Sequence, residues 1–117
     1  MSQPSPPAAP FTVRVEPGPD ATVVHCDGRL VGEASTTLRT EVKKLMEPNK
    51  RIVLDLTGVT TTDSLGLGAI TSLYISAKSI GARLELINLG QKIRQVFSMA
   101  NLLSLFEPAV DNTSRIP

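Results

Sequence analysis

The segment from Thr60 to Gly68 holds the densest group of side chains that could do chemistry. It places one carboxylate, Asp63, and four hydroxyl groups directly before a stretch with helical periodicity. The first turn of a helix leaves backbone amides without partners, and a side-chain oxygen of Asp63 or Ser64 is the natural cap for them. The same amides and the helix dipole also favour a phosphate, which either binds there or is attached to a serine. The spacing leaves capping, phosphate binding and phosphorylation open.

Two glycines, Gly66 and Gly68, follow in what should be the first helical turns. Each costs a helix roughly 0.5 to 1 kcal/mol relative to alanine, which indicates that something approaches the backbone closely there. The pair lacks the third glycine of a dinucleotide fingerprint, and the chain has no G-x-x-x-x-G-K-[ST] loop. We therefore expect no cofactor, and any ATP that acts on this protein would be held by a partner.

Other candidate residues are weaker. Asp55, at the end of an expected strand, faintly resembles the nucleophile of the aspartyl phosphohydrolases, but the second acid of that mechanism would fall at Thr57. His25 and Cys26 are adjacent in a strand and point to opposite faces, so they do not chelate one metal ion together. We expect no enzyme activity and no metal site.

Hydrophobic periodicity predicts the elements that hold this segment in place. The turn at Pro17-Gly18 joins the first two strands as an antiparallel pair, and Gly28 is expected to end the second strand. Residues 57–62 are expected to form a loop. The predicted strands cover 11–16, 21–26, 51–56, 83–89 and 103–106, and the predicted helices cover 34–46, 65–80 and 91–100.

The order of these elements predicts an α/β fold. Strand 51–56 is apolar without alternation at its centre, which is typical of a strand covered on both faces in the middle of a sheet. A strand, a helix and a strand with short links form a right-handed crossover, so 51–56 and 83–89 should be parallel neighbours or near neighbours. We expect a single mixed β-sheet, in the order β-β-α-β-α-β-α-β, with helices packed on it and no internal repeat.

The composition limits the class of protein. The chain has 117 residues, about one domain's worth, and its 12 basic and 11 acidic residues are scattered rather than gathered into a stripe. With only 3 phenylalanines and 1 tyrosine, this makes nucleic acid a poor candidate partner. Cys26 is the single cysteine, and neither a signal peptide nor a membrane-spanning apolar run is recognisable. We expect a cytoplasmic protein that does not insert into membranes.

The expected domain covers residues 11–108. Residues 1–10 are rich in proline and small residues, a composition that favours a disordered, extended tail. Its P-x-x-P spacing is one that unstructured termini carry by chance. Residues 109–117 are expected to form a frayed C-terminal tail.

Four stretches of the sequence together carry a family resemblance. They read R-I-V-L-D-L-T-G at 51–58, D-S-L-G-L-G at 63–68, G-A-R-L-E-L-I-N at 81–88 and I-R-Q-V-F-S-M-A-N-L-L-S-L-F at 93–106. With this order and spacing, nearly all of residues 11–108 resembles a STAS domain, the family of bacterial anti-sigma factor antagonists. In that family, the serine directly after the aspartate is phosphorylated by an anti-sigma factor that is itself a serine kinase. The resemblance implies Ser64 as the acceptor and Asp63 as the neighbouring acid.

The resemblance also implies a partner switch in transcription regulation. The unmodified protein would bind the kinase and free a sigma factor, and the phosphorylated protein would be released. A phosphate adds about −1.5 to −2 charges that must be desolvated in an interface, and a penalty of about 3 kcal/mol weakens binding more than a hundredfold. No change of fold is needed.

The sequence departs from the family pattern at several positions. Thr61 and Thr62 stand where the family commonly has an aromatic and an aliphatic residue, so they are rival, less favoured acceptors. Leu65 replaces a frequent second hydroxyl residue, which excludes modification there. Arg29 and Val31 replace two acids of a motif near the first helix, so the partner contacts should differ from the usual ones.

These observations predict a non-enzymatic partner-switch module regulated at Ser64. The rival hypothesis is a constitutive scaffold, such as the STAS-like subunits of lipid-transport or stress-signalling assemblies, which docks through the same surface without phosphorylation. The sequence does not indicate an oligomeric state. The predicted partner-binding residues are Thr62, Asp63, Ser64, Leu65, Gly66, Leu67 and Gly68.

Overall fold

A computed structural model describes residues 10–101 of the chain. The predictions for a strand over 103–106 and for the two tails fall outside this range, apart from Pro10. The elements are β1 (Thr12–Pro17), β2 (Thr22–Leu30), α1 (Ala34–Lys43), β3 (Arg51–Thr62), α2 (Ser64–Ser79), β4 (Arg83–Ile87) and α3 (Gln91–Met99). Every strand and helix predicted within the described range is present.

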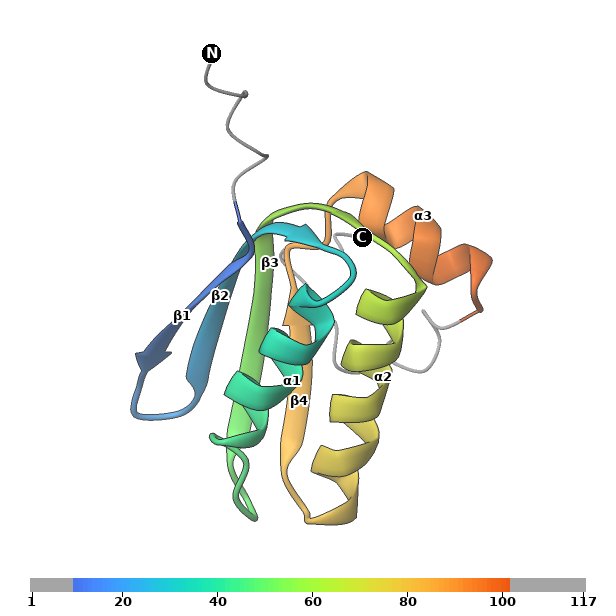
Figure 1. Cartoon of the computed structure of the whole chain (residues 1–117). Coiled ribbons are helices and arrows are strands. Elements are labelled where there is room, and N and C mark those ends of the chain that lie inside the picture. The colour runs from blue at the N-terminus through green and yellow to red at the C-terminus, as the bar shows by residue number, and fades with distance from the viewer. Residues whose placement is uncertain (1–9, 102–117) are drawn as a thin grey trace.

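The four strands form one mixed sheet in the order β1-β2-β3-β4. β1 runs antiparallel to β2, whereas β2 and β3, and β3 and β4, are parallel. The predicted hairpin, the interior position of β3 and the β3-α2-β4 crossover are therefore confirmed. Figure 1 shows α1 and α2 side by side over one face of the sheet, with α3 beyond the end of β4.

The core is aliphatic, as the scarcity of aromatic residues requires. Alternate residues of β2 and β3 point into it, and the apolar sides of α1 and α2 close it. Burying one of these leucine, isoleucine or valine side chains contributes about 1.5–3 kcal/mol. The largest fully buried side chains are Phe97, Leu30, Leu38, Ile52, Leu54, Leu56, Ile70, Leu73, Leu86, Val24 and Val42.

The predicted carboxyl-terminal ends of β2 and β3 are wrong. β3 continues through residues 57–62, which were expected to form a loop, and β2 continues past Gly28 to Leu30. Gly28 has a φ of 105° and lies at an irregularity in the β2–β3 pairing, so the strand bends there without ending. Pairing then resumes as far as Leu30 and Thr62. Both strands thus reach the start of α2.

Two other elements end earlier than predicted. α1 ends at Lys43, because the amides of Leu45 and Met46 bond to carbonyls three residues back, at 2.9 and 3.2 Å, in tighter turns. β4 ends at Ile87, because Asn88 takes a left-handed conformation with a φ of 58°. No helix within residues 10–101 has the length and apolar character needed to cross a membrane.

Candidate functional site

The predicted acceptor lies where β3 passes into α2. Thr62 is the last residue of β3, Asp63 caps the helix, and Ser64 is its first residue. This junction is at the carboxyl ends of the parallel strands, the edge at which α/β sheets commonly bind ligands and partners. Ser64 is exposed there.

Asp63 is the residue that caps α2. Its Oδ1 accepts a hydrogen bond from the Gly66 amide at 3.0 Å, and its Oδ2 accepts one from the Gly32 amide at 3.0 Å. The first bond satisfies an orphan amide of the helix, and the second ties the helix start to the loop between β2 and α1. Both bonds lower the pKa of Asp63, and the bond from the Gly66 amide has the larger effect. Asp63 is therefore a carboxylate at neutral pH. Asp63 and Ser64 were both candidates for the cap, and the Ser64 hydroxyl takes no part in it.

The close approach expected at the glycines is made by the chain itself at Gly66. A Cβ on Gly66 would overlap Thr62 Oγ1 and the carbonyl oxygen of Leu30. Thr62 Oγ1 in turn donates a hydrogen bond to that carbonyl at 2.9 Å, so its hydroxyl is occupied. Gly68 differs, because a Cβ there would meet nothing within 4 Å. The first glycine is explained by packing, whereas the second faces open space.

Only part of the predicted partner-binding set is directly accessible. Ser64 and Gly68 are exposed, and the Leu65 residue is 57% exposed although it is large and apolar. We call these three residues the Ser64 surface. Gly66 and Leu67 are buried and support this surface from beneath, while Thr61, Thr62 and Asp63 are half-buried.

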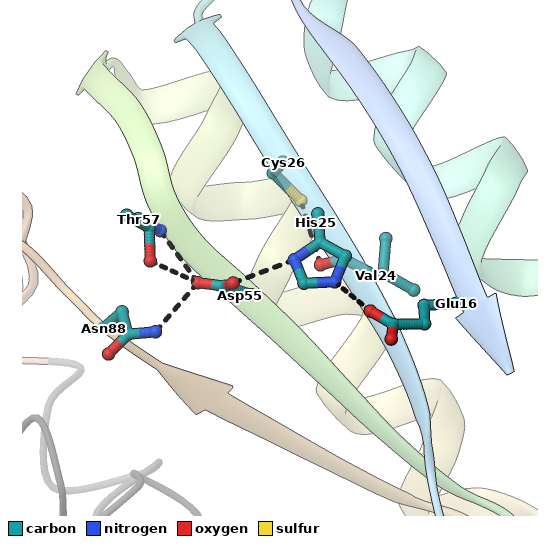
Figure 2. A network of polar contacts seen from close by, with 7 residues as sticks. All are labelled: Glu16, Val24, His25, Cys26, Asp55, Thr57 and Asn88. Atoms are coloured by element: carbon teal, nitrogen blue, oxygen red, sulfur yellow. Dashed lines mark hydrogen bonds and ion pairs between the residues drawn. The ribbon is translucent and has the colours of Figure 1, made fainter. Parts of the chain in front are cut away.

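A second polar cluster lies on the sheet face away from α1 and α2 (Figure 2). Its centre is Asp55, whose Oδ1 accepts hydrogen bonds from the Thr57 amide at 3.0 Å, Thr57 Oγ1 at 2.6 Å and Asn88 Nδ2 at 3.0 Å. Asp55 Oδ2 contacts His25 Nδ1 at 2.9 Å, and His25 Nε2 contacts Glu16 Oε1 at 2.7 Å. We call these five residues the His25 cluster.

The contacts of Asp55 give its carboxylate a structural role. Burial would raise the pKa of Asp55, but the hydrogen bonds from Thr57, Asn88 and His25 outweigh it and lower the pKa to about 2. Both carboxylate oxygens are engaged, and the side chain is 14% exposed. The carboxylate therefore holds β2, β3 and the loop after β4 together.

The His25 cluster was not predicted from the sequence. His25 and Asp55 are 30 residues apart in the chain, and only the β2–β3 register, which places His25 opposite Asp55, brings them together. The expectation that His25 and Cys26 point to opposite faces is confirmed: Cys26 is in the core, where burial raises the pKa of its thiol to about 12. Among the described residues, no group of three or more histidine, cysteine or acidic side chains could hold a metal ion.

The fold and the junction between β3 and α2 can now be compared with known proteins. The sequence pattern of the STAS domain matches residues 11–115. The chain belongs to the STAS domain family. The resemblance stated from the sequence is thereby confirmed, as is the mixed-sheet fold expected with it.

Solved structures share the architecture of this STAS domain. An anti-sigma factor antagonist from Mycobacterium paratuberculosis matches with a TM-score of 0.73 and 20% identity, covering 91% of this chain and 87% of that chain. The Bacillus cell fate determinant SpoIIAA, in its phosphorylated form, matches with a TM-score of 0.65 and 18% identity, covering 86% and 89%. The murine anion transporter Slc26a9 matches with a TM-score of 0.69 and 21% identity, covering 78% of this chain but 16% of that chain. At these identities the likeness shows the fold.

Proposed function

We propose that this STAS domain is a cytoplasmic bacterial anti-sigma factor antagonist that acts by partner switching. Unmodified, it binds a serine-kinase anti-sigma factor through the Ser64 surface, and phosphorylation of Ser64 releases it. The observation that carries the proposal is the exposure of Ser64 at the first residue of a capped helix. The neighbouring antagonist structures, one of them phosphorylated, support the proposal.

The electrostatics of the junction support charge as the release mechanism. A phosphate on Ser64 would lie at the positive end of α2, where the helix dipole favours it, so the fold can accept it. The same phosphate would stand beside the Asp63 carboxylate, whose lowered pKa keeps it ionised. A partner that covers the site must then desolvate a dianion next to a second negative charge, which is costly unless it is paired.

The structure favours Ser64 over the two rival acceptors. Thr61 and Thr62 are half-buried in β3, whereas Ser64 is exposed. The hydroxyl of Thr62 donates to the Leu30 carbonyl, and a phosphate on it would break that bond in the tight contact with Gly66. We therefore assign Ser64 as the acceptor, with ATP held by the partner and no catalytic role for this domain.

The second candidate function is a scaffold that docks without being phosphorylated. The similarity to Slc26a9 favours it, because the matched part is 16% of a longer anion transporter chain. The two functions differ in whether Ser64 is modified. A scaffold would use the Ser64 surface for permanent contact and would keep its affinity in the presence of ATP.

Phosphate mapping tests the proposal. The protein is incubated with ATP and each serine-kinase anti-sigma factor encoded in the same genome, and the modification is located by mass spectrometry. We expect phosphate on Ser64, its loss in Ser64→Ala and its retention in Thr61→Val. Absence of phosphate from Ser64 with every kinase would instead support the scaffold.

A further inference from the structure

His25 lies between two carboxylates that come from the strands on either side of it. Its Nδ1 is 2.9 Å from Asp55 Oδ2 on β3, and its Nε2 is 2.7 Å from Glu16 Oε1 on β1 (Figure 2). A neutral imidazole has one N–H donor, so it can donate to only one of these oxygens. Both contacts are hydrogen bonds only when the ring carries two protons. The geometry therefore favours a positively charged His25.

The two partners of His25 are held with unequal strength. Asp55 is 14% exposed and keeps three hydrogen bonds from Thr57 and Asn88 whatever the state of His25. The Glu16 side chain is 60% exposed and makes no other side-chain hydrogen bond or ion pair among the described residues. If His25 loses its second proton, the neutral ring can keep its bond to Asp55, so Glu16 is the partner that is released.

β1 depends on this contact more than the other strands do. Within residues 10–101 it is an edge strand that pairs with β2 alone, and most of its residues are exposed. Two half-buried side chains, Phe11 just before it and Val13 within it, pack against the core. In the part of the chain that the structure describes, the link from Glu16 to a protonated His25 is the one ion pair between β1 and the rest of the sheet.

We propose that the second proton on His25 is a pH-sensitive latch that fastens β1 to the sheet, and that its loss as the pH rises loosens β1. The latch is independent of phosphorylation at Ser64. It lies on the sheet face away from α1 and α2, so it can act without disturbing the Ser64 surface at the start of α2.

The groups around His25 determine whether the latch opens as the pH rises or as it falls. The hydrogen bond to Glu16 makes the largest contribution and raises the pKa of His25. Burial lowers the pKa, and the hydrogen bond to Asp55 raises it. Arg14, which lies opposite His25 in the β1–β2 pair, also lowers it. The net effect is a pKa above the ordinary 6.5. The contribution to stability is therefore complete below 6.5 and is lost as the pH rises through the raised pKa.

The remaining charged groups near the cluster are few. Asp27 lies two residues further along β2. Lys92 and Arg94 are the charged residues of α3, the helix that packs against β3. The latch variants below leave all three unchanged.

The test measures the His25 pKa and the opening of β1 in the same protein. The ring ¹⁵N chemical shifts of the full-length chain give the pKa by NMR titration. Hydrogen exchange of the β1 amides, corrected for the intrinsic pH dependence of exchange, is then measured about two pH units below and above that pKa. We expect a His25 pKa above 6.5 and a loss of β1 protection on the order of fivefold at the higher pH, with β3 unchanged.

Matched variants separate the latch from a general effect of pH. Glu16→Gln removes the charge from the exposed partner, so its β1 protection should be low at both pH values. Glu47→Gln changes a charge on an exposed residue outside the cluster, and it should keep the wild-type response. A His25 pKa at or below 6.5, β1 protection that does not change across the titration, or a wild-type response in Glu16→Gln would each overturn the proposal.

Discussion

Asp63 and Ser64 are neighbours in the chain with divided roles. Both could cap a helix, but the carboxylate of Asp63 does so and also binds the Gly32 amide, which leaves Ser64 at the surface. Sequence reasoning identified the pair and could not divide the roles, because the Gly32 contact joins positions 31 residues apart. Modification of Ser64 would therefore break no bond of the cap.

The two glycines of α2 give a prediction on stability. Gly66→Ala should lower the free energy of unfolding by about 2 kcal/mol or more, because its Cβ would overlap the Leu30 backbone. Gly68→Ala is the matched control and should raise it by about 0.5–1 kcal/mol, because the Cβ meets open space and alanine favours a helix. Urea denaturation measures both. Equal stability of the two variants would show that the approach of Leu30 to α2 is looser than described.

The carboxylate of Asp55 gives a prediction at acid pH. Its pKa is lowered from 3.8 to about 2, so its contribution is complete above 3.8 and is lost as the pH falls towards 2. The shift corresponds to about 2 kcal/mol. Unfolding free energies measured across this range should fall by about that much more for the wild type than for Asp55→Asn, which cannot titrate. Parallel pH profiles for the two proteins would contradict the assigned role of Asp55.

β3 is longer than its sequence predicts, because it continues through residues 57–62. Residues 57–62 contain four threonines and a glycine and no apolar alternation, so sequence patterns predict a loop. They form a strand because the end of β2 pairs with them as far as Leu30 and Thr62. The extension brings the carbonyl of Leu30 to the start of α2, and this contact explains Gly66. A local pattern cannot reveal a strand that depends on its neighbour for pairing.

The exposed side of α2 gives a prediction on binding. Leu65 and Ile75 are both large, apolar and more than half exposed, at 57% and 59%, and lie about 15 Å apart along the helix. An interface centred on Ser64 should include Leu65 but not Ile75. Leu65→Ser should therefore weaken binding of the kinase partner about tenfold, and Ile75→Ser should leave it within about twofold. Isothermal titration calorimetry measures both affinities, and equal losses would place the interface along the whole helix instead.

At the scale of the whole molecule, the fold follows from the sequence more fully than the polar clusters do. The mixed sheet, the crossover and the aliphatic core were predictable because they rest on periodicity and chain order. The His25 cluster was not, because it needs the register of three strands and the left-handed turn at Asn88. Ser64 is intermediate: its place between β3 and α2 was predictable, while its exposure emerged only from the folded structure.

Release by phosphorylation is tested most directly by measuring the affinity of one kinase partner for the unmodified protein and for the protein phosphorylated at Ser64. Far-ultraviolet circular dichroism of both forms checks that the fold is retained. We predict affinity at least about a hundredfold weaker after phosphorylation, with unchanged spectra, because the interface must desolvate the added charge. Equal affinity of the two forms would contradict the proposal that the charge on Ser64 releases the partner.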